Sequence, residues 1–211
     1  MILLARLKRA GAEKRLRQNQ FGFRSGRSTA DALFIVRRNM EAAWSRKGGS
    51  LMLLALDWRK TFDRILPDAL FAALRRFGLP EEIIEVIKNI YASRSFTVTD
   101  CGRTSATRRQ STGISQGCPL SPFLFGIVMT ILMHDAVALL GKDAKEAYEI
   151  GTLSDIEFAD DTMLMGVNHI FLQEVTDAVE KVGREFGLEL HWGKVQLANV
   201  QSDQRILSTV L

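Results

Sequence analysis

Cysteine and histidine are scarce in this 211-residue chain, and their scarcity excludes several classes of protein. The two cysteines, Cys101 and Cys118, lack metal-ligand spacing and do not suggest a disulfide framework, so we expect a reducing, intracellular compartment. The three histidines stand alone and carry no predicted chemistry. Internal repeats and low-complexity segments are absent, and 46% of the residues are hydrophobic, enough for a packed core. One or two globular domains are therefore expected.

Long apolar runs are missing too. Residues 1–5 are too short for the core of a signal peptide, and basic residues follow them at once. The longest uncharged stretch, residues 110–133, is interrupted by Pro119, Pro122 and Gly126. Its apolar part falls short of the roughly 18 residues of a membrane span. This stretch predicts a buried helix, and no membrane partner is expected.

Acids are nearly absent from the N-terminal arm, which we define as residues 1–27. The arm contains eight basic residues and one acid, Glu13, and carries a net charge of +7. The rest of the chain is −3, so the arm accounts for the whole excess behind the overall charge of +4. Concentrated positive charge favours a polyanionic partner. A solvated basic helix without a partner is the alternative.

Hydrophobic periodicity and turn signals predict an α+β fold, an antiparallel sheet covered on one face by helices. The expected helices are residues 28–46, 67–78, 80–90, 121–140 and 168–186. The expected strands are residues 51–56, 96–99, 153–158, 162–166 and 188–191. Residues 102–110, rich in arginine, predict a basic hairpin followed by a return strand.

Three aspartates carry the strongest chemical signal. Asp160 and Asp161 lie at the turn between two short predicted strands, and Asp57 ends the apolar strand 51–56. Adjacent carboxylates repel each other, and divalent cations relieve that repulsion. Hard oxygen ligands of this kind suit Mg²⁺ or Mn²⁺, and such a group of acids is what two-metal phosphoryl transfer requires. A solvated Asp-Asp turn is the ordinary alternative.

Two further segments combine glycine with polar residues. In residues 113–122 the glycines permit close backbone approach to a ligand, and Gln116 offers both a donor and an acceptor. In residues 20–29 arginines precede a predicted helix N-terminus, where phosphate is favoured. An ordinary loop-to-helix junction explains the first segment equally well.

Together these segments resemble the reverse transcriptase family, most closely the enzymes of non-LTR (LINE-like) retroelements. The resemblance rests on residues 20–29, 56–63, 113–122 and 158–161, which occur in the family's order. Group II intron-type enzymes share several of these blocks. The resemblance implies a polymerase palm, a small antiparallel sheet backed by helices, with fingers and without a thumb. Residues 1–50 would form part of the fingers with the basic arm, and residues 51–211 the palm, with a fingers-like insertion around 95–112.

The resemblance also implies roles for individual residues. Asp57 and Asp160 would hold two Mg²⁺ (or Mn²⁺) ions, with Asp161 assisting. The implied nucleotide-binding residues are Arg24 and Arg27 at the triphosphate, Phe62 as a gate beneath the sugar, Gln116 and Gly117 along the templating base, and Lys194 near the leaving pyrophosphate. For Phe62 the alternative is a core aromatic, and for Lys194 a surface lysine. Asp63 is expected to be structural, bonding free backbone N–H groups near the next helix.

The implied activity is DNA synthesis on an RNA template from a DNA primer and dNTPs. Three positions depart from the family's pattern: Thr61 stands where alanine is usual, His191 where asparagine is usual, and Val195 where a small hydroxyl residue is usual. With the thumb lacking, a weakly active or inactive remnant that binds nucleic acid is the first alternative. A protein-interaction domain with accidental acids is the second.

Overall fold

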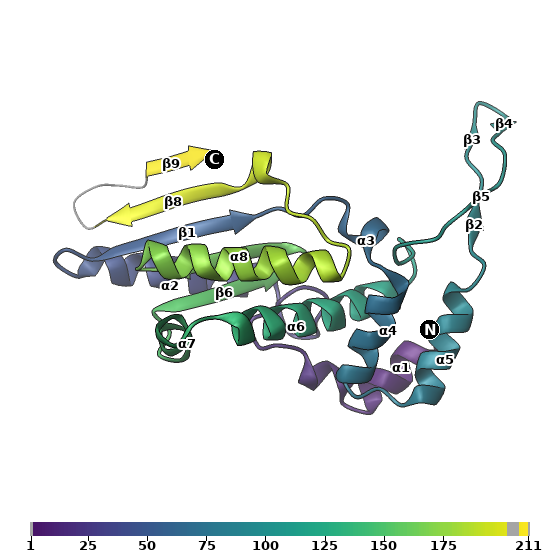
Figure 1. The fold of residues 1–211 in the computed structure, drawn as a ribbon, viewed down its shortest axis with the longest axis horizontal. Helices are drawn as coiled ribbons and strands as arrows, with labels where there is room; N and C mark the ends of the chain where they lie inside the picture. Colours follow the sequence, from purple (N-terminus) through teal and green to yellow (C-terminus); the bar gives the residue numbers. More distant parts are fainter. Residues whose placement is uncertain (1, 202–206, 211) are drawn as a thin grey trace.

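A five-stranded antiparallel sheet forms the centre of the fold (Figure 1). The structure is a computed structural model that describes residues 2–201 and 207–210. The strand order is β6-β7-β1-β8-β9. The strands are β1 (Ser50–Leu56), β6 (Leu153–Phe158), β7 (Asp161–Gly166), β8 (Gln196–Gln201) and β9 (Leu207–Val210). The α+β prediction is confirmed.

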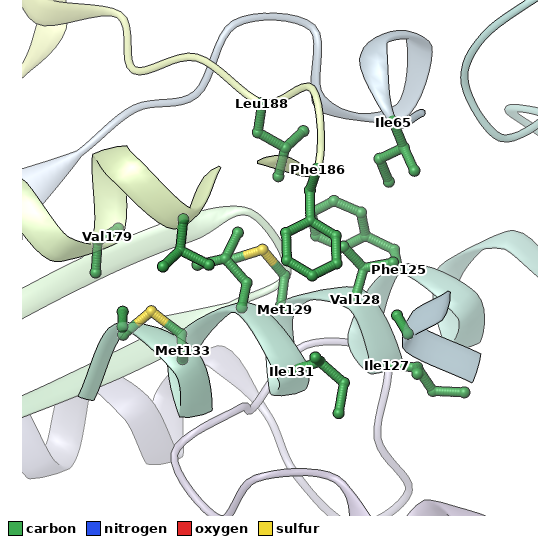
Figure 2. Close-up of a cluster of buried hydrophobic side chains, with 14 of the residues drawn as sticks. Ile65, Phe125, Ile127, Val128, Met129, Ile131, Met133, Val179, Phe186 and Leu188 are labelled. Carbon is green, nitrogen blue, oxygen red and sulfur yellow. The ribbon is translucent and has the colours of Figure 1, made fainter. Parts of the chain in front are cut away.

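The central helix α6 (Ser121–Leu139) and α8 (His169–Glu185) cover one face of the sheet. Figure 2 shows Phe125, Val128 and Met129 of α6 packed towards Phe186 and Leu188, which follow α8. By length and composition α6 could cross a membrane, but 67% of its most apolar window is buried inside the protein. It is the core helix that the apolar stretch predicted.

Helix α2 (Thr29–Ser45) lies on the opposite face of the sheet, where Ala32 and Val36 join a second core with Leu53 and Met165. A capping box between Ser28 and Asp31 begins the helix. The prediction that helices cover only one face is therefore wrong. Apolar side chains occupy successive positions of β1 because both faces of the strand are buried. The assignment of residues 1–50 to the fingers stays a prediction.

Smaller helices complete the body: α1 (Ile2–Arg9), η1 (Ala12–Arg15), α3 (Thr61–Arg64), α4 (Pro67–Arg76), α5 (Glu81–Tyr91), α7 (Lys142–Glu149) and η2 (Trp192–Lys194). The N-terminal arm is folded onto the body, because Leu7, Ala12 and Leu16 are buried in the main core. The apolar side chains of the arm are thus part of the core.

A hairpin is present, but its bounds differ from the prediction: it is a two-part ribbon that stands away from the body (Figure 1), and the arginine-rich segment 102–110 supplies only its returning half. β2 (Ser95–Phe96) pairs with β5 (Arg108–Arg109), and β3 (Thr99–Asp100) pairs with β4 (Arg103–Thr104). We call residues 95–109 the ribbon.

The predicted strand 188–191 is wrong. Within the described residues this segment forms only an isolated bridge between Leu190 and Trp58. The last strands of the sheet are β8 and β9, which the sequence analysis did not identify. β8 mixes polar and apolar residues, and their burial does not alternate regularly, so its sequence does not predict a strand. Its strand conformation depends on pairing with β1.

Candidate active site

The register of β1 on β7 brings two of the three aspartates together. The pairing ends at Leu56 opposite Thr162, so the next residues in the same register are Asp57 and Asp161. In a strand, alternate residues point to one face, and both acids belong to the set that faces α2. Partial burial, followed by the charges of Asp160 and Asp57, raises the pKa of the Asp161 carboxyl. All three acids therefore gather at one end of the sheet.

Gln20 clamps the turn that carries Asp160. Phe158 pairs with Asp161, which leaves Ala159 and Asp160 as a two-residue turn with Ala159 at φ +59°. The Gln20 amide accepts from Ala159 N (2.9 Å) and donates to Ala159 O (3.1 Å). It is buried, with 1% of its surface exposed, so these bonds are protected from water. An uncommon left-handed alanine is thereby held at the base of the acidic turn.

A close backbone approach explains the glycine two residues after Gln20. A Cβ built on Gly22 would lie 2.1 Å from the backbone nitrogen of Ala159. Gly22 N also donates to Gln20 Oε1 at 2.8 Å. Any side chain at position 22 would push the acidic turn away from the clamp.

Thr61 fixes the orientation of Asp160. Its hydroxyl donates to Asp160 Oδ2 at 2.9 Å, and the threonine is 4% exposed at the start of α3. The alanine usual at this position would leave Asp160 without this partner. The departure noted in the sequence thus acts directly on one of the three acids.

Lys194 lies beside the third acid. Its Nζ is 3.6 Å from Asp57 Oδ2, and both side chains are substantially exposed. The backbone of Asp57 is held from the same side, because its carbonyl accepts from His191 N at 2.7 Å. The segment around His191 therefore brings Lys194 to the acids, although it forms no regular strand.

Arg24 and Arg27 lie close together but are held by the loop that bears them. Arg24 Nη1 donates to Arg17 O (2.6 Å), and Arg27 Nη2 donates to Gln18 Oε1 (2.6 Å). Partial burial and the charge of Arg27 lower the pKa of Arg24. Their roles in triphosphate binding stay predictions.

Phe62 belongs to α3, and Gln116, next to Gly117 in the chain, is bonded to the same helix. The Phe62 ring stacks on Phe125 of α6 with centroids 4.9 Å apart, so the core fixes its position. The exposed Gln116 donates to Asp63 Oδ1 at 3.2 Å. Asp63 is thus bound to a side chain, where a bond to backbone N–H groups was expected. Gly117 is exposed in the left-handed region at φ +82°. The nucleotide-binding roles of Phe62, Gln116 and Gly117 stay predictions.

Comparison with protein families matches residues 1–210 to the family described as "Reverse transcriptase (RNA-dependent DNA polymerase)". The chain belongs to the reverse transcriptase family. The resemblance inferred from four short blocks is confirmed over nearly the whole domain.

Relatives of this reverse transcriptase domain come from retrotransposable elements. The Pol polyprotein of element R2DM from Drosophila melanogaster is 26% identical over 77% of this chain, and that of element R2 from Nasonia vitripennis is 32% identical over 71%. The matched regions cover 15% and 14% of those proteins. The predicted likeness to non-LTR elements is confirmed.

Solved structures confirm the polymerase fold of this reverse transcriptase domain. Apo telomerase from Candida tropicalis, truncated from its C-terminal domain, superposes with a TM-score of 0.67 at 14% identity over 99% of this chain and 41% of that chain. Telomerase from Candida albicans, in complex with the TWJ fragment of telomeric RNA, gives 0.65 at 15% identity over 92% of this chain and 33% of that chain. At these identities the likeness shows the fold alone.

The donor atoms of the reverse transcriptase's acids fit a divalent cation. Their carboxylate oxygens are hard ligands, and the mutual repulsion that raises the pKa of Asp161 is what a cation relieves. Across residues 2–201 and 207–210, no three His, Cys, Asp or Glu side chains form a ready-made metal-binding group. Asp57 and Asp161 adjoin across the strands, while Thr61 holds Asp160. The carboxylate donors therefore fit a divalent cation. As they are arranged here, fewer than three of these acids converge on one point.

Behind the acidic turn lies a buried charge cluster that the sequence analysis missed. Arg17 donates to Glu157 Oε1 (2.5 Å) and to Asp155 through both terminal nitrogens (2.9 and 2.8 Å), and Tyr148 donates to Asp155. Both carboxylates are fully buried on β6. Burial, opposed by Arg17, raises the pKa of Glu157 to about 8.

This cluster connects to the active site through Gln20, whose Nε2 donates to Glu157 Oε2 at 3.0 Å. The segment before Phe21 pairs with the edge of β6 around Glu157. In the sequence Arg17 was one of eight basic residues of the arm. Its only detectable signal was the pair of acids at alternate positions of a predicted strand, because such acids need a partner when that face is buried.

Proposed function

We propose that this domain synthesises DNA on an RNA template, transferring nucleotides from dNTPs to a primer 3′-hydroxyl with two Mg²⁺ or Mn²⁺ ions. The observation that carries the proposal is the β1–β7 register, which places Asp57 beside Asp161 next to the turn bearing Asp160. When bound, the ions would activate the primer hydroxyl and neutralise charge on the triphosphate.

The chain's own residues supply binding and orientation. Gln20 and Thr61 hold the acidic turn and the Asp160 carboxylate, which limits the reorganisation needed when the substrates bind. The adjacent guanidiniums of Arg24 and Arg27 attract the triphosphate. Lys194, beside Asp57, is placed to give a proton to the leaving pyrophosphate.

The Phe62 ring is the proposed gate for the sugar. Its stacking on Phe125 gives it a rigid support. A rigid ring beneath the sugar would clash with a 2′-hydroxyl, which favours dNTPs over rNTPs. The RNA template is supported by the family, whose description is an RNA-dependent DNA polymerase.

A second candidate is a domain that binds nucleic acid without polymerising. It is favoured by the ion pair between Lys194 and Asp57, which occupies an oxygen that a metal would need, and by the absence of a ready-made three-ligand group from the described residues.

Primer extension separates the two candidates. With a labelled DNA primer annealed to RNA, Mg²⁺ and dNTPs, we expect the primer to lengthen to the end of the template, and rNTPs to give little product. Tight binding of the same primer–template without any lengthening, in Mg²⁺ and in Mn²⁺, would favour the binding-only candidate. Failure both to bind and to extend would contradict both.

A further inference from the structure

The ribbon buries nothing against the rest of the protein. All fifteen residues from 95 to 109 are exposed, and Phe96 and Val98 show 50% and 58% of their surface. A two-stranded hairpin without a packed face is only marginally stable in water. The exposed aromatic ring and the exposed valine leave apolar surface on this element that a partner can cover.

The net positive charge of the ribbon favours a polyanion as its partner. It carries Arg103, Arg108 and Arg109 against a single acid, Asp100. Among the described residues, none of these three guanidiniums forms an ion pair with a carboxylate. Their charge is available to an external ligand, unlike that of Arg17.

The register of the ribbon places an aromatic ring beside one arginine. Phe96 pairs with Arg108, so the two side chains lie on the same face of the ribbon. Arg109 pairs with Ser95 and points to the other face. A ring next to a guanidinium suits an unpaired base with its phosphate, because stacking needs an open base face and the phosphate needs a cation.

The base of the ribbon is tied to the active site. Arg94 donates to Gly113 O and Ser115 Oγ, both at 2.6 Å, in the loop that leads to Gln116. The same loop is bonded to α3, where Ile114 N donates to Phe62 O at 2.7 Å. A strand held by the ribbon would thus lie next to the segment that carries Phe62 and Thr61.

We propose that the ribbon binds a single-stranded segment of the RNA template, with Phe96 stacked on an unpaired base and Arg108 on a neighbouring phosphate. The RNA identity of this strand rests on the function proposed above. Arg109, on the other face, adds charge without touching that strand.

Binding of a labelled 12-nucleotide single-stranded RNA, measured by fluorescence anisotropy over a range of salt concentrations, tests this inference. Phe96→Leu is expected to weaken binding about fivefold or more with an unchanged salt slope, since stacking contributes independently of counterions. Phe96→Trp should restore the affinity. Arg108→Gln should reduce the slope of log affinity against log salt by about 0.7, the loss of one phosphate contact.

Arg109→Gln is the matched control, because it removes the same charge from the adjacent position. We expect less than half the effect of Arg108→Gln. Equal effects of the two arginine variants, with Phe96→Leu binding like the wild type, would overturn the inference in favour of unspecific attraction. Equal weakening of a blunt RNA–DNA duplex by Phe96→Leu would overturn the single-stranded assignment.

This assay needs neither metal nor dNTP, so its outcome is separable from polymerisation. If the wild-type chain extends primers normally, and Phe96→Leu and Arg108→Gln bind RNA like the wild type, only the ribbon inference is contradicted. If the wild-type chain extends no primer, yet Phe96→Leu and Arg108→Gln bind RNA more weakly than the wild type, the ribbon inference is supported and the polymerase proposal is contradicted.

Discussion

Asp160→Asn is expected to abolish primer extension while leaving the fold intact. The amide has the shape of the carboxylate and can still accept from Thr61, but it lacks the negative charge that a divalent cation requires. The rate of extension should fall by on the order of a thousandfold or more, because removing a single group that stabilises the developing charge already costs up to about a thousandfold. Single-turnover extension on an RNA template measures it.

The matched control is Asp143→Asn, an exposed aspartate in the first turn of α7, which should extend primers normally. Asp160→Asn should also keep its affinity for the primer–template and a melting temperature at or above that of the wild type, because one of three repelling charges is gone. Extension by Asp160→Asn within tenfold of the wild type would show that the acidic turn does not carry the chemistry.

Arg17→Met should have the largest effect on stability, about 3–5 kcal/mol in the free energy of unfolding. Methionine preserves the apolar part of the side chain but leaves Asp155 and Glu157 buried without their cation. Urea unfolding followed by circular dichroism measures the loss. Lys14→Met, an exposed lysine of the same arm, is the control and should stay within about 0.5 kcal/mol of the wild type.

The pH dependence of that loss identifies its cause. The pKa of Glu157 is raised from 4.5 to about 8, so between these values the folded state binds more protons than the unfolded state. Wild-type stability should therefore fall as pH rises through this window and level off above it. Without Arg17, ionising Glu157 costs more, so the gap between variant and wild type should be larger at pH 9 than at pH 5. A gap independent of pH would indicate lost packing instead.

The positions of the three acids at strand ends were predictable because they depend on local features of the chain. An apolar run ending in Asp57, and two short strands joined at Asp160 and Asp161, already imply acids at strand ends. The pairing of those strands requires only that the two runs be neighbours in one sheet, and the register then follows. The core helix α6 was also predictable from the sequence, since most of its residues are apolar.

The supports of the site were not predictable, because they join residues far apart in the chain. Gln20 reaches Ala159, and Arg17 reaches Asp155 and Glu157, across more than 130 positions. A count of basic residues cannot distinguish a buried arginine from a solvated one. Thr61 stood out as a departure, but its bond to Asp160 depends on the turn of α3.

The central claim is that three distant aspartates form a site for divalent ions, and anomalous diffraction tests it most directly. Crystals soaked with Mn²⁺ and a dNTP should show Mn²⁺ bound by the carboxylate oxygens of Asp57 and Asp160, with Asp161 adjacent. An ordered triphosphate without manganese at these acids, or with manganese bound only elsewhere, would contradict the account.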